Sequence, residues 1–219
     1  MPAYMSIVCQ FSLNDRAGLV NKFCDAFFGK GVKFNGVPAS VGESKMTLDQ
    51  VVEWNQSEMD SYTFGFDDLN RPDYRQIRLR VPPFSQCRLI LRNRFDLIEF
   101  ECIVPEDEIN SVNTGSLERA CRRIWSRLPA LAIESYAESM PGFVEGPSSI
   151  ESGTPPAAEL FAFIDYDCTQ QDYVQYFQVK PLDRGYMLTP KDIQQDASSE
   201  SPRTSGLKRL FSRLRQWGH

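Results

Sequence analysis

Residues 77–104 have the sequence IRLRVPPFSQCRLILRNRFDLIEFECIV, in which apolar and polar side chains alternate in three successive runs. Alternation with a period of two predicts β-strands. Pro82–Pro83 and Arg92–Asn93–Arg94 separate the runs. Connections this short join antiparallel strands, because a parallel crossover needs a dozen or more residues. The segment therefore predicts an antiparallel meander.

The last strand of this meander has an apolar side and a charged side. Ile98, Phe100 and Cys102 are expected to face the core. Glu99 and Glu101 are expected to face outward, where arginines of the neighbouring strands can pair with them across the sheet.

Helical spacing of apolar residues predicts three helices around the meander. We expect Asn14 or Asp15 to cap the first helix. Residues 47–50, TLDQ, form a capping-box pattern, and the second helix is expected to run from there to about Asn55. The third helix has the clearest pattern, with apolar side chains at positions 117, 120, 121, 124, 125 and 128, followed by Pro129.

The remaining pattern completes an α+β domain. Further strands are predicted at residues 3–12, 131–136, 160–166, 173–180 and 186–189. Eleven of the residues in 139–156 are Ser, Gly or Pro, and they predict a long loop. We therefore expect an α+β domain over residues 1–189, with a mainly antiparallel sheet and two or three helices packed on one face.

The composition changes after this domain. Residues 190–206 are polar and predict a flexible tether. Residues 207–217 then predict a basic amphipathic helix. Its apolar stripe and its basic faces are formed, respectively, by Leu207, Leu210, Phe211, Leu214 and Trp217, and by Lys208, Arg209, Arg213 and Arg215.

This predicted helix is the candidate binding site for a partner or a membrane. A helix so short is marginal alone in water, so its apolar stripe needs a surface to cover it. Three surfaces meet that need: the acidic body of the same chain, a groove on a partner protein, and an anionic membrane.

Charge is distributed unevenly along the chain. The whole sequence has 24 Lys and Arg against 29 Asp and Glu, a net charge of -5. Residues 203–219 contain five basic residues and no acidic residue, which leaves 19 basic against 29 acidic residues in 1–202, a balance of -10. A body with this charge repels a phosphate backbone, which disfavours nucleic acid as the main ligand.

Several catalytic classes lack the residues that they need. The single histidine is His219, so histidine-dependent nucleophile systems and histidine zinc sites have no internal histidine. Residues 31–36 have the glycine spacing of a phosphate-binding loop, but Val37 and Pro38 follow where Lys and Ser or Thr are required. The sequence therefore predicts no catalytic residue, no metal site and no cofactor.

Features of secreted or membrane-spanning proteins are not found in the sequence. The six cysteines are scattered without a C-x-x-C pair and are expected to pack in the core as thiols. No apolar run approaches the ~20 residues that cross a bilayer, and the first residues do not resemble a signal peptide. These observations predict a cytoplasmic protein.

A carboxylate- or metal-dependent enzyme is the alternative from another class. Asp165 and Asp167 close a predicted strand, where two carboxylates can hold a divalent cation or share acid–base work. Glu99 and Glu101 offer a second pair of acids. Aspartates in such turns more often form local hydrogen bonds, and we expect that role for Asp165 and Asp167.

The sequence as a whole predicts a non-enzymatic, cytoplasmic protein-binding module, either an adaptor or an inhibitor. It would act through its acidic body, its basic C-terminal helix, or both. An antitoxin or immunity-type inhibitor of a basic target is one form, since negative charge speeds association with cationic proteins. Peripheral membrane attachment through the helix is a further alternative.

Overall fold

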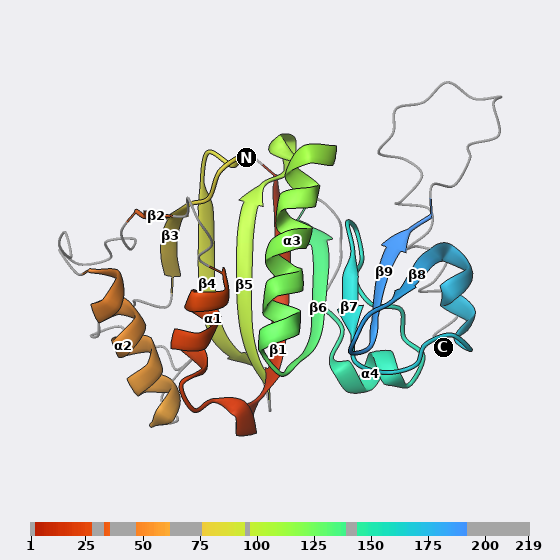
Figure 1. Cartoon of the computed structure of the whole chain (residues 1–219), viewed down its shortest axis with the longest axis horizontal. Helices are drawn as coiled ribbons and strands as arrows, with labels where there is room; N and C mark the ends of the chain where they lie inside the picture. The colour runs from red at the N-terminus through yellow and green to blue at the C-terminus, as the bar shows by residue number, and fades with distance from the viewer. Residues whose placement is uncertain are drawn as a thin grey trace.

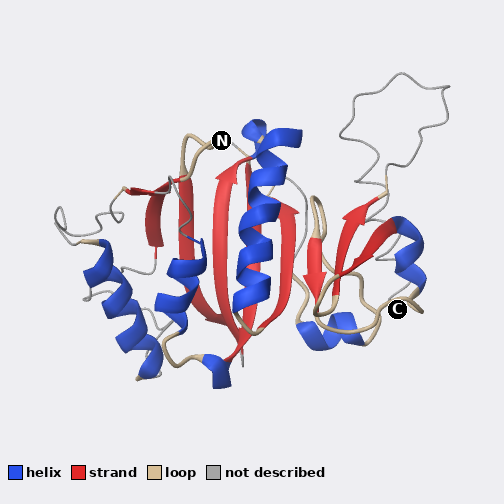
Figure 2. Ribbon diagram, in the orientation of Figure 1, coloured by secondary structure: helices blue, strands red, loops and turns tan. Residues whose placement is uncertain are grey.

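A computed structural model describes residues 3–27, 33–35, 47–61, 76–94, 97–138 and 144–191. Within these ranges the strands form one nine-stranded antiparallel sheet in the order β2-β3-β4-β5-β1-β6-β7-β9-β8. Helices pack against the sheet (Figures 1 and 2). The architecture is α+β, as the sequence predicts.

The middle of the sheet is built from three long strands, β1 (Tyr4–Ser12), β5 (Leu97–Pro105) and β6 (Ala130–Ala137). β1 lies between the other two, so that Cys9 pairs with Phe100 on one side and with Ile133 on the other. The side chains of β1 are buried on both faces, except at its two ends. This strand therefore has covered surfaces above and below it.

The predicted meander is confirmed. It consists of β3 (Gln76–Arg80), β4 (Cys87–Arg94) and β5, which pair antiparallel in chain order. The short strand β2 (Lys33–Phe34) pairs with β3 and forms the edge of the sheet on this side.

On the other side of the centre, the sheet continues through β7 (Ala162–Ile164), β9 (Tyr186–Pro190) and β8 (Phe177–Pro181). The predicted strand over 173–180 begins later in the structure, because residues 172–176 form the 3₁₀ helix η3 (Asp172–Tyr176). Tyr173 is buried in this helix. Its position also fits the alternation expected of a strand, which is why the sequence pattern predicted a strand there.

Three helices cover one face of the sheet (Figure 1). They are α1 (Leu19–Phe27), α2 (Leu48–Asp60) and α3 (Ser111–Arg127). Their apolar sides join the main core, where the ring of Phe23 packs edge-on against Phe100 with 4.4 Å between centroids. The prediction of helices on one face is confirmed for these three.

The opposite face has a second, smaller core at the C-terminal side of the sheet. It contains Ala132, Ile164 and Leu188 from the strands, together with Tyr173 of η3 and Ile150 of the short helix α4 (Pro147–Glu151). The prediction that 139–156 is entirely loop is therefore wrong for α4, since Pro147 starts a helical turn and Ile150 is buried. Residues 139–143 lie outside the described ranges.

Two helix boundaries also differ from those predicted. Asn14 and Asp15 do not cap α1, because they lie within the 3₁₀ helix η1 (Leu13–Asp15), and α1 starts after Gly18, whose φ is +65°. The capping box of α2 is present as predicted, but α2 continues past Asn55 to Asp60. The second half of α2 contains buried polar residues, and they interrupt the helical spacing of apolar residues in the sequence.

The six cysteines lie within the described ranges, and each is a buried free thiol, as predicted. Most of the predicted tether and the predicted helix over 207–217 lie outside those ranges. In the part of the chain that is described, no helix combines the length and apolar character that crossing a membrane requires.

Candidate functional site

Three glutamates from distant parts of the sequence meet on the sheet face opposite α1, α2 and α3. Glu99 and Glu101 lie on β5, and Glu134 lies on β6, with β1 between these strands. Their exposed fractions are 1%, 3% and 0%, respectively. The expectation that Glu99 and Glu101 face outward to solvent is therefore wrong. They do point away from the main core, but that face of the sheet is covered as well.

Arg92 of β4 forms ion pairs with both glutamates of β5. Its Nε lies 3.3 Å from the Glu99 carboxylate, and its Nη2 donates to the Glu101 carboxylate. The predicted pairing of arginine and glutamate across neighbouring strands is thus confirmed. The Arg92 side chain is 40% exposed, so this ion pair reaches from the buried face to solvent.

Tyr136 of β6 reaches over β1 to the same network. Its hydroxyl donates to Glu101 Oε1 at 2.7 Å. Burial, together with the negative charge of Glu101, raises the pKa of Tyr136 to about 12. The phenol therefore stays protonated and remains a donor at neutral pH.

Gln10 connects the network to a loop that follows β6. Its Nε2 donates to Glu99 Oε1 at 3.4 Å and to the backbone carbonyl of Glu145 at 3.1 Å. Glu145 in turn donates its backbone N–H to Glu134 Oε2 at 3.2 Å, and Ala157 donates to the same oxygen at 2.7 Å.

Burial raises the pKa of Glu134 well above its ordinary value, and the two backbone hydrogen bonds oppose that effect. The nearby charges of Glu145 and Glu99 raise this pKa further. The neutral acid is therefore favoured at Glu134, in contrast to the ion-paired carboxylates of Glu99 and Glu101.

The described residues do not assemble a metal centre. Nowhere in these ranges do three or more His, Cys, Asp or Glu side chains come together in a way that could hold a metal ion. The Glu99 and Glu101 carboxylates are occupied by Arg92, and Glu134 by backbone donors. This network is arranged for structural polar contacts within a covered face.

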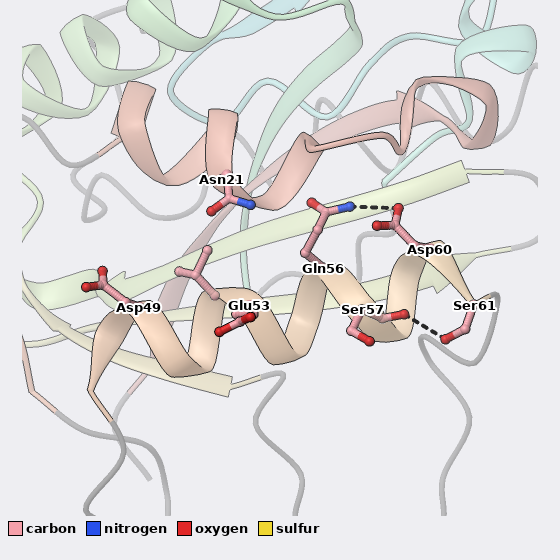
Figure 3. A pocket seen from close by; sticks show the side chains of 8 residues that line it. Asn21, Asp49, Glu53, Gln56, Ser57, Asp60 and Ser61 are labelled. Carbon is pink, nitrogen blue, oxygen red and sulfur yellow. Dashed lines mark hydrogen bonds between the residues drawn. The ribbon is translucent and has the colours of Figure 1, made fainter.

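A second acidic region is open to solvent. A hollow of about 820 Å³ lies between α1 and α2 (Figure 3). Among the described residues its lining has no basic side chain and consists of Asn21, Asp49, Val52, Glu53, Gln56, Ser57, Asp60 and Ser61. Asp49, Glu53 and Asp60 are exposed. We call this feature the α1–α2 hollow.

The helices that form the α1–α2 hollow are negatively charged beyond its lining. α1 and α2 together carry five acidic residues and one basic residue, Lys22. The acidic residues are Asp25, Asp49, Glu53, Glu58 and Asp60. Part of the negative balance of the body is thus concentrated on one pair of neighbouring helices.

Asp165 and Asp167 are not brought into a common site. Asp165 pairs with Arg184 at 3.1 Å. Asp167 accepts hydrogen bonds from the hydroxyl of Thr169 at 2.7 Å and from its backbone N–H at 2.9 Å, and these bonds lower the pKa of Asp167. This is the local turn bonding that the sequence suggests for such aspartates.

The remaining predicted site residues are those of the C-terminal segment, and they lie outside the described ranges. Sequence reasoning did not identify Glu134 or the α1–α2 hollow. The available signal for Glu134 was that it is the one charged residue of the predicted strand over 131–136, LAIESY. The signal for the hollow was the spacing of Asp49, Glu53 and Asp60 along one helix.

Comparison with known proteins does not assign a family. No protein-family model matches the sequence, and no curated protein has significant similarity to it.

Proposed function

We propose that this chain is a non-enzymatic, cytoplasmic protein-binding module that recognises a basic partner through its acidic body. The observation that carries this proposal is the α1–α2 hollow, whose described lining has three exposed carboxylates and no basic residue. The basic C-terminal segment, residues 203–219, is proposed as a second contact region.

Electrostatics supports the choice of a basic partner. Exposed charges of one sign on two adjacent helices steer an oppositely charged protein and raise its association rate. A hollow of this size accommodates a few side chains rather than a whole protein, so we propose that lysine or arginine side chains of the partner enter it.

The candidate catalytic acids have separate partners in the structure, which also favours binding over catalysis. Glu99 and Glu101 are buried and paired with Arg92. Asp165 and Asp167 have separate partners. The exposed carboxylates that line one concave surface come from a single helix, α2. Such a cluster of carboxylates is sufficient to bind a cationic group.

Neutralisation of the hollow tests this proposal. The variant Asp49→Asn, Glu53→Gln, Asp60→Asn removes three charges while keeping the shape of each side chain. A matched control, Asp107→Asn, Glu151→Gln, Asp172→Asn, removes three exposed charges elsewhere. Each protein is used for affinity capture from a lysate of the source cells, followed by quantitative mass spectrometry.

The proposal expects a basic protein that the wild type and the control retain and the hollow variant loses. With that protein purified, calorimetry should show binding that weakens as salt is raised. Equal recovery on all three baits, or purified binding that is independent of salt, would overturn the assignment of the hollow.

The two forms of the module make different predictions for the C-terminal segment. An inhibitor, such as an antitoxin or immunity-type protein, is expected to bind its basic target after residues 190–219 are removed. An adaptor is expected to relocate a reporter protein that carries residues 190–219 alone. Co-sedimentation with anionic vesicles, with and without residues 203–219, tests the remaining alternative of membrane attachment.

A further inference from the structure

The carboxyl group of Glu134 holds both ends of one chain segment. Its Oε2 accepts from the backbone N–H of Glu145 at 3.2 Å and from that of Ala157 at 2.7 Å. Helix α4 lies between these two residues. A single oxygen of β6 therefore holds residues 145–157 in place. This segment covers part of the second sheet face.

The two ends of the segment 145–157 are held by different contacts. Ala157 is also bonded through its carbonyl, which accepts from the backbone N–H of Ser135 at 2.9 Å. The Ser135 hydroxyl accepts from Leu160 and Phe161, so the chain beyond Ala157 has further anchors on the sheet. Glu145 is bonded to the side chains of Gln10 and Glu134. The N-terminal end thus depends more strongly on the state of Glu134.

The second oxygen of Glu134 favours the neutral state. Glu134 Oε1 is buried and has no hydrogen-bond partner among the described residues. Gln10 Oε1, on the neighbouring strand β1, is likewise buried without a donor. An ionised carboxylate in this position would place charge on an unsolvated oxygen. A proton on Oε1 removes the charge and turns one of the acceptors into a donor.

The charged groups around Glu134 do not replace such a proton. Glu99 on β5 and Glu145 in the segment 145–157 are acids, and they disfavour a negative charge on Glu134. Arg92 on β4 is the cation that contacts the neighbouring carboxylates, and it is engaged by Glu99 and by Glu101.

The aromatic hydroxyls nearby are neutral. Tyr136 on β6 donates to Glu101. Burial raises the pKa of Tyr173 in η3 to about 12 and that of Tyr166 after β7 above its ordinary range. These phenols therefore neither supply nor accept charge near neutral pH.

We propose that Glu134 is a proton-dependent latch. Residues 145–157 cover the neutral carboxyl group, and its ionisation loosens that segment because hydration of the carboxylate outweighs the strengthening of its two backbone hydrogen bonds. The step is a simple dissociation, in which the carboxyl O–H gives its proton to water and leaves a carboxylate. Because burial raises the pKa of Glu134, the latched form persists at pH values where an exposed glutamate is already ionised.

Hydrogen–deuterium exchange over a range of pH tests the latch. After correction for the intrinsic exchange rate, the wild-type amides of residues 144–158 should lose protection as pH rises, while those of β1 and β5 keep theirs. Glu134→Gln keeps an acceptor oxygen and stays neutral, so its segment should remain protected at every pH. Glu151→Gln removes an exposed charge from α4 within the same segment and should follow the wild type.

A second measurement detects the proton itself. At a pH where exposed glutamates are ionised, the infrared carbonyl band of a protonated carboxyl group should be present in the wild type and absent from Glu134→Gln. The latch is overturned if this band is missing from the wild type. It is also overturned if wild-type protection of residues 144–158 does not change with pH, or if Glu134→Gln shows the same pH dependence as the wild type.

Discussion

The side chain of Gln56 in α2 caps the first turn of α1, since its Oε1 accepts from the backbone N–H of Val20 at 2.9 Å. Its Nε2 donates to the carbonyl of Arg16 and to Asp60. Gly18 precedes α1 and offers no side chain for this purpose. A residue 36 positions later in the chain therefore supplies the cap that a local Ser or Asp usually provides.

Replacement of this cap should destabilise the protein. Gln56→Ala leaves the buried N–H of Val20 without a partner, and we expect a loss of about 1–3 kcal/mol in the free energy of unfolding. Urea denaturation provides the measurement. Gln175→Ala, at an exposed position in η3, is the control and should change the stability by less than about 0.5 kcal/mol. Equal effects of the two substitutions would contradict the capping role.

Glu134 should make stability depend on pH. Its folded-state pKa is raised, so the stability that it contributes is complete below the ordinary glutamate pKa and is lost as pH rises toward the folded-state value. Glu134→Gln lacks this loss. The difference in unfolding free energy between the variant and the wild type should grow by about 1.4 kcal/mol per pH unit within that window. Urea titrations from acidic to mildly alkaline pH measure the difference, and parallel curves would refute the expectation.

Arg92 should be needed for stability because it is ion-paired with two buried carboxylates. Arg92→Met removes the positive charge that contacts the buried carboxylates of Glu99 and Glu101. Removal of one partner of a fully buried pair costs ~3–5 kcal/mol, and the partial exposure of Arg92 reduces our expectation to about 2 kcal/mol.

A compensating variant separates lost charge balance from lost packing. In Arg92→Met, Glu99→Gln, Glu101→Gln, the carboxylates are gone, and most of the lost stability should return. Arg127→Met, at an exposed arginine of α3, serves as the control. If the triple variant is no more stable than Arg92→Met, the ion pairs are not the reason that Arg92 is required.

Gly185 should not tolerate a side chain. Its φ is +63°, and a Cβ at this position would lie 2.0 Å from the carbonyl oxygen of Ile164. Gly185→Ala should therefore cost more than the ~1–2 kcal/mol of the left-handed conformation alone. Gly146→Ala is the matched control, because Gly146 has a φ of -74° and no atom within 4 Å of an added Cβ. Thermal unfolding of both variants measures the contrast.

Periodicity predicted most of the sheet and the helix over 117–128. The meander was predictable because its alternation and short connections leave one pairing arrangement. The burial of Glu99 and Glu101 was not. Alternation states which residues share a face, but it does not state whether another part of the chain covers that face. Residues 145–157, which help to cover it, looked like a loop because α4 is so short.

The candidate sites were less predictable than the fold. Glu134 and the glutamates of β5 share one face with β1 between their strands, and no local pattern encodes that strand order. The cap from Gln56 to Val20 also depends on tertiary packing. By contrast, the turn bonding of Asp167 with Thr169 is local, and the sequence indicated it correctly.

The central position of β1 has a consequence for biosynthesis. Gln10 and its neighbour Glu99 are 89 residues apart in the chain. At an elongation rate of ~5–20 residues per second, a ribosome needs roughly 5–20 seconds to deliver β5 after β1. During that interval the apolar nascent strand has no edge to join, and chaperones that shield exposed apolar segments are expected to engage it before the sheet can close.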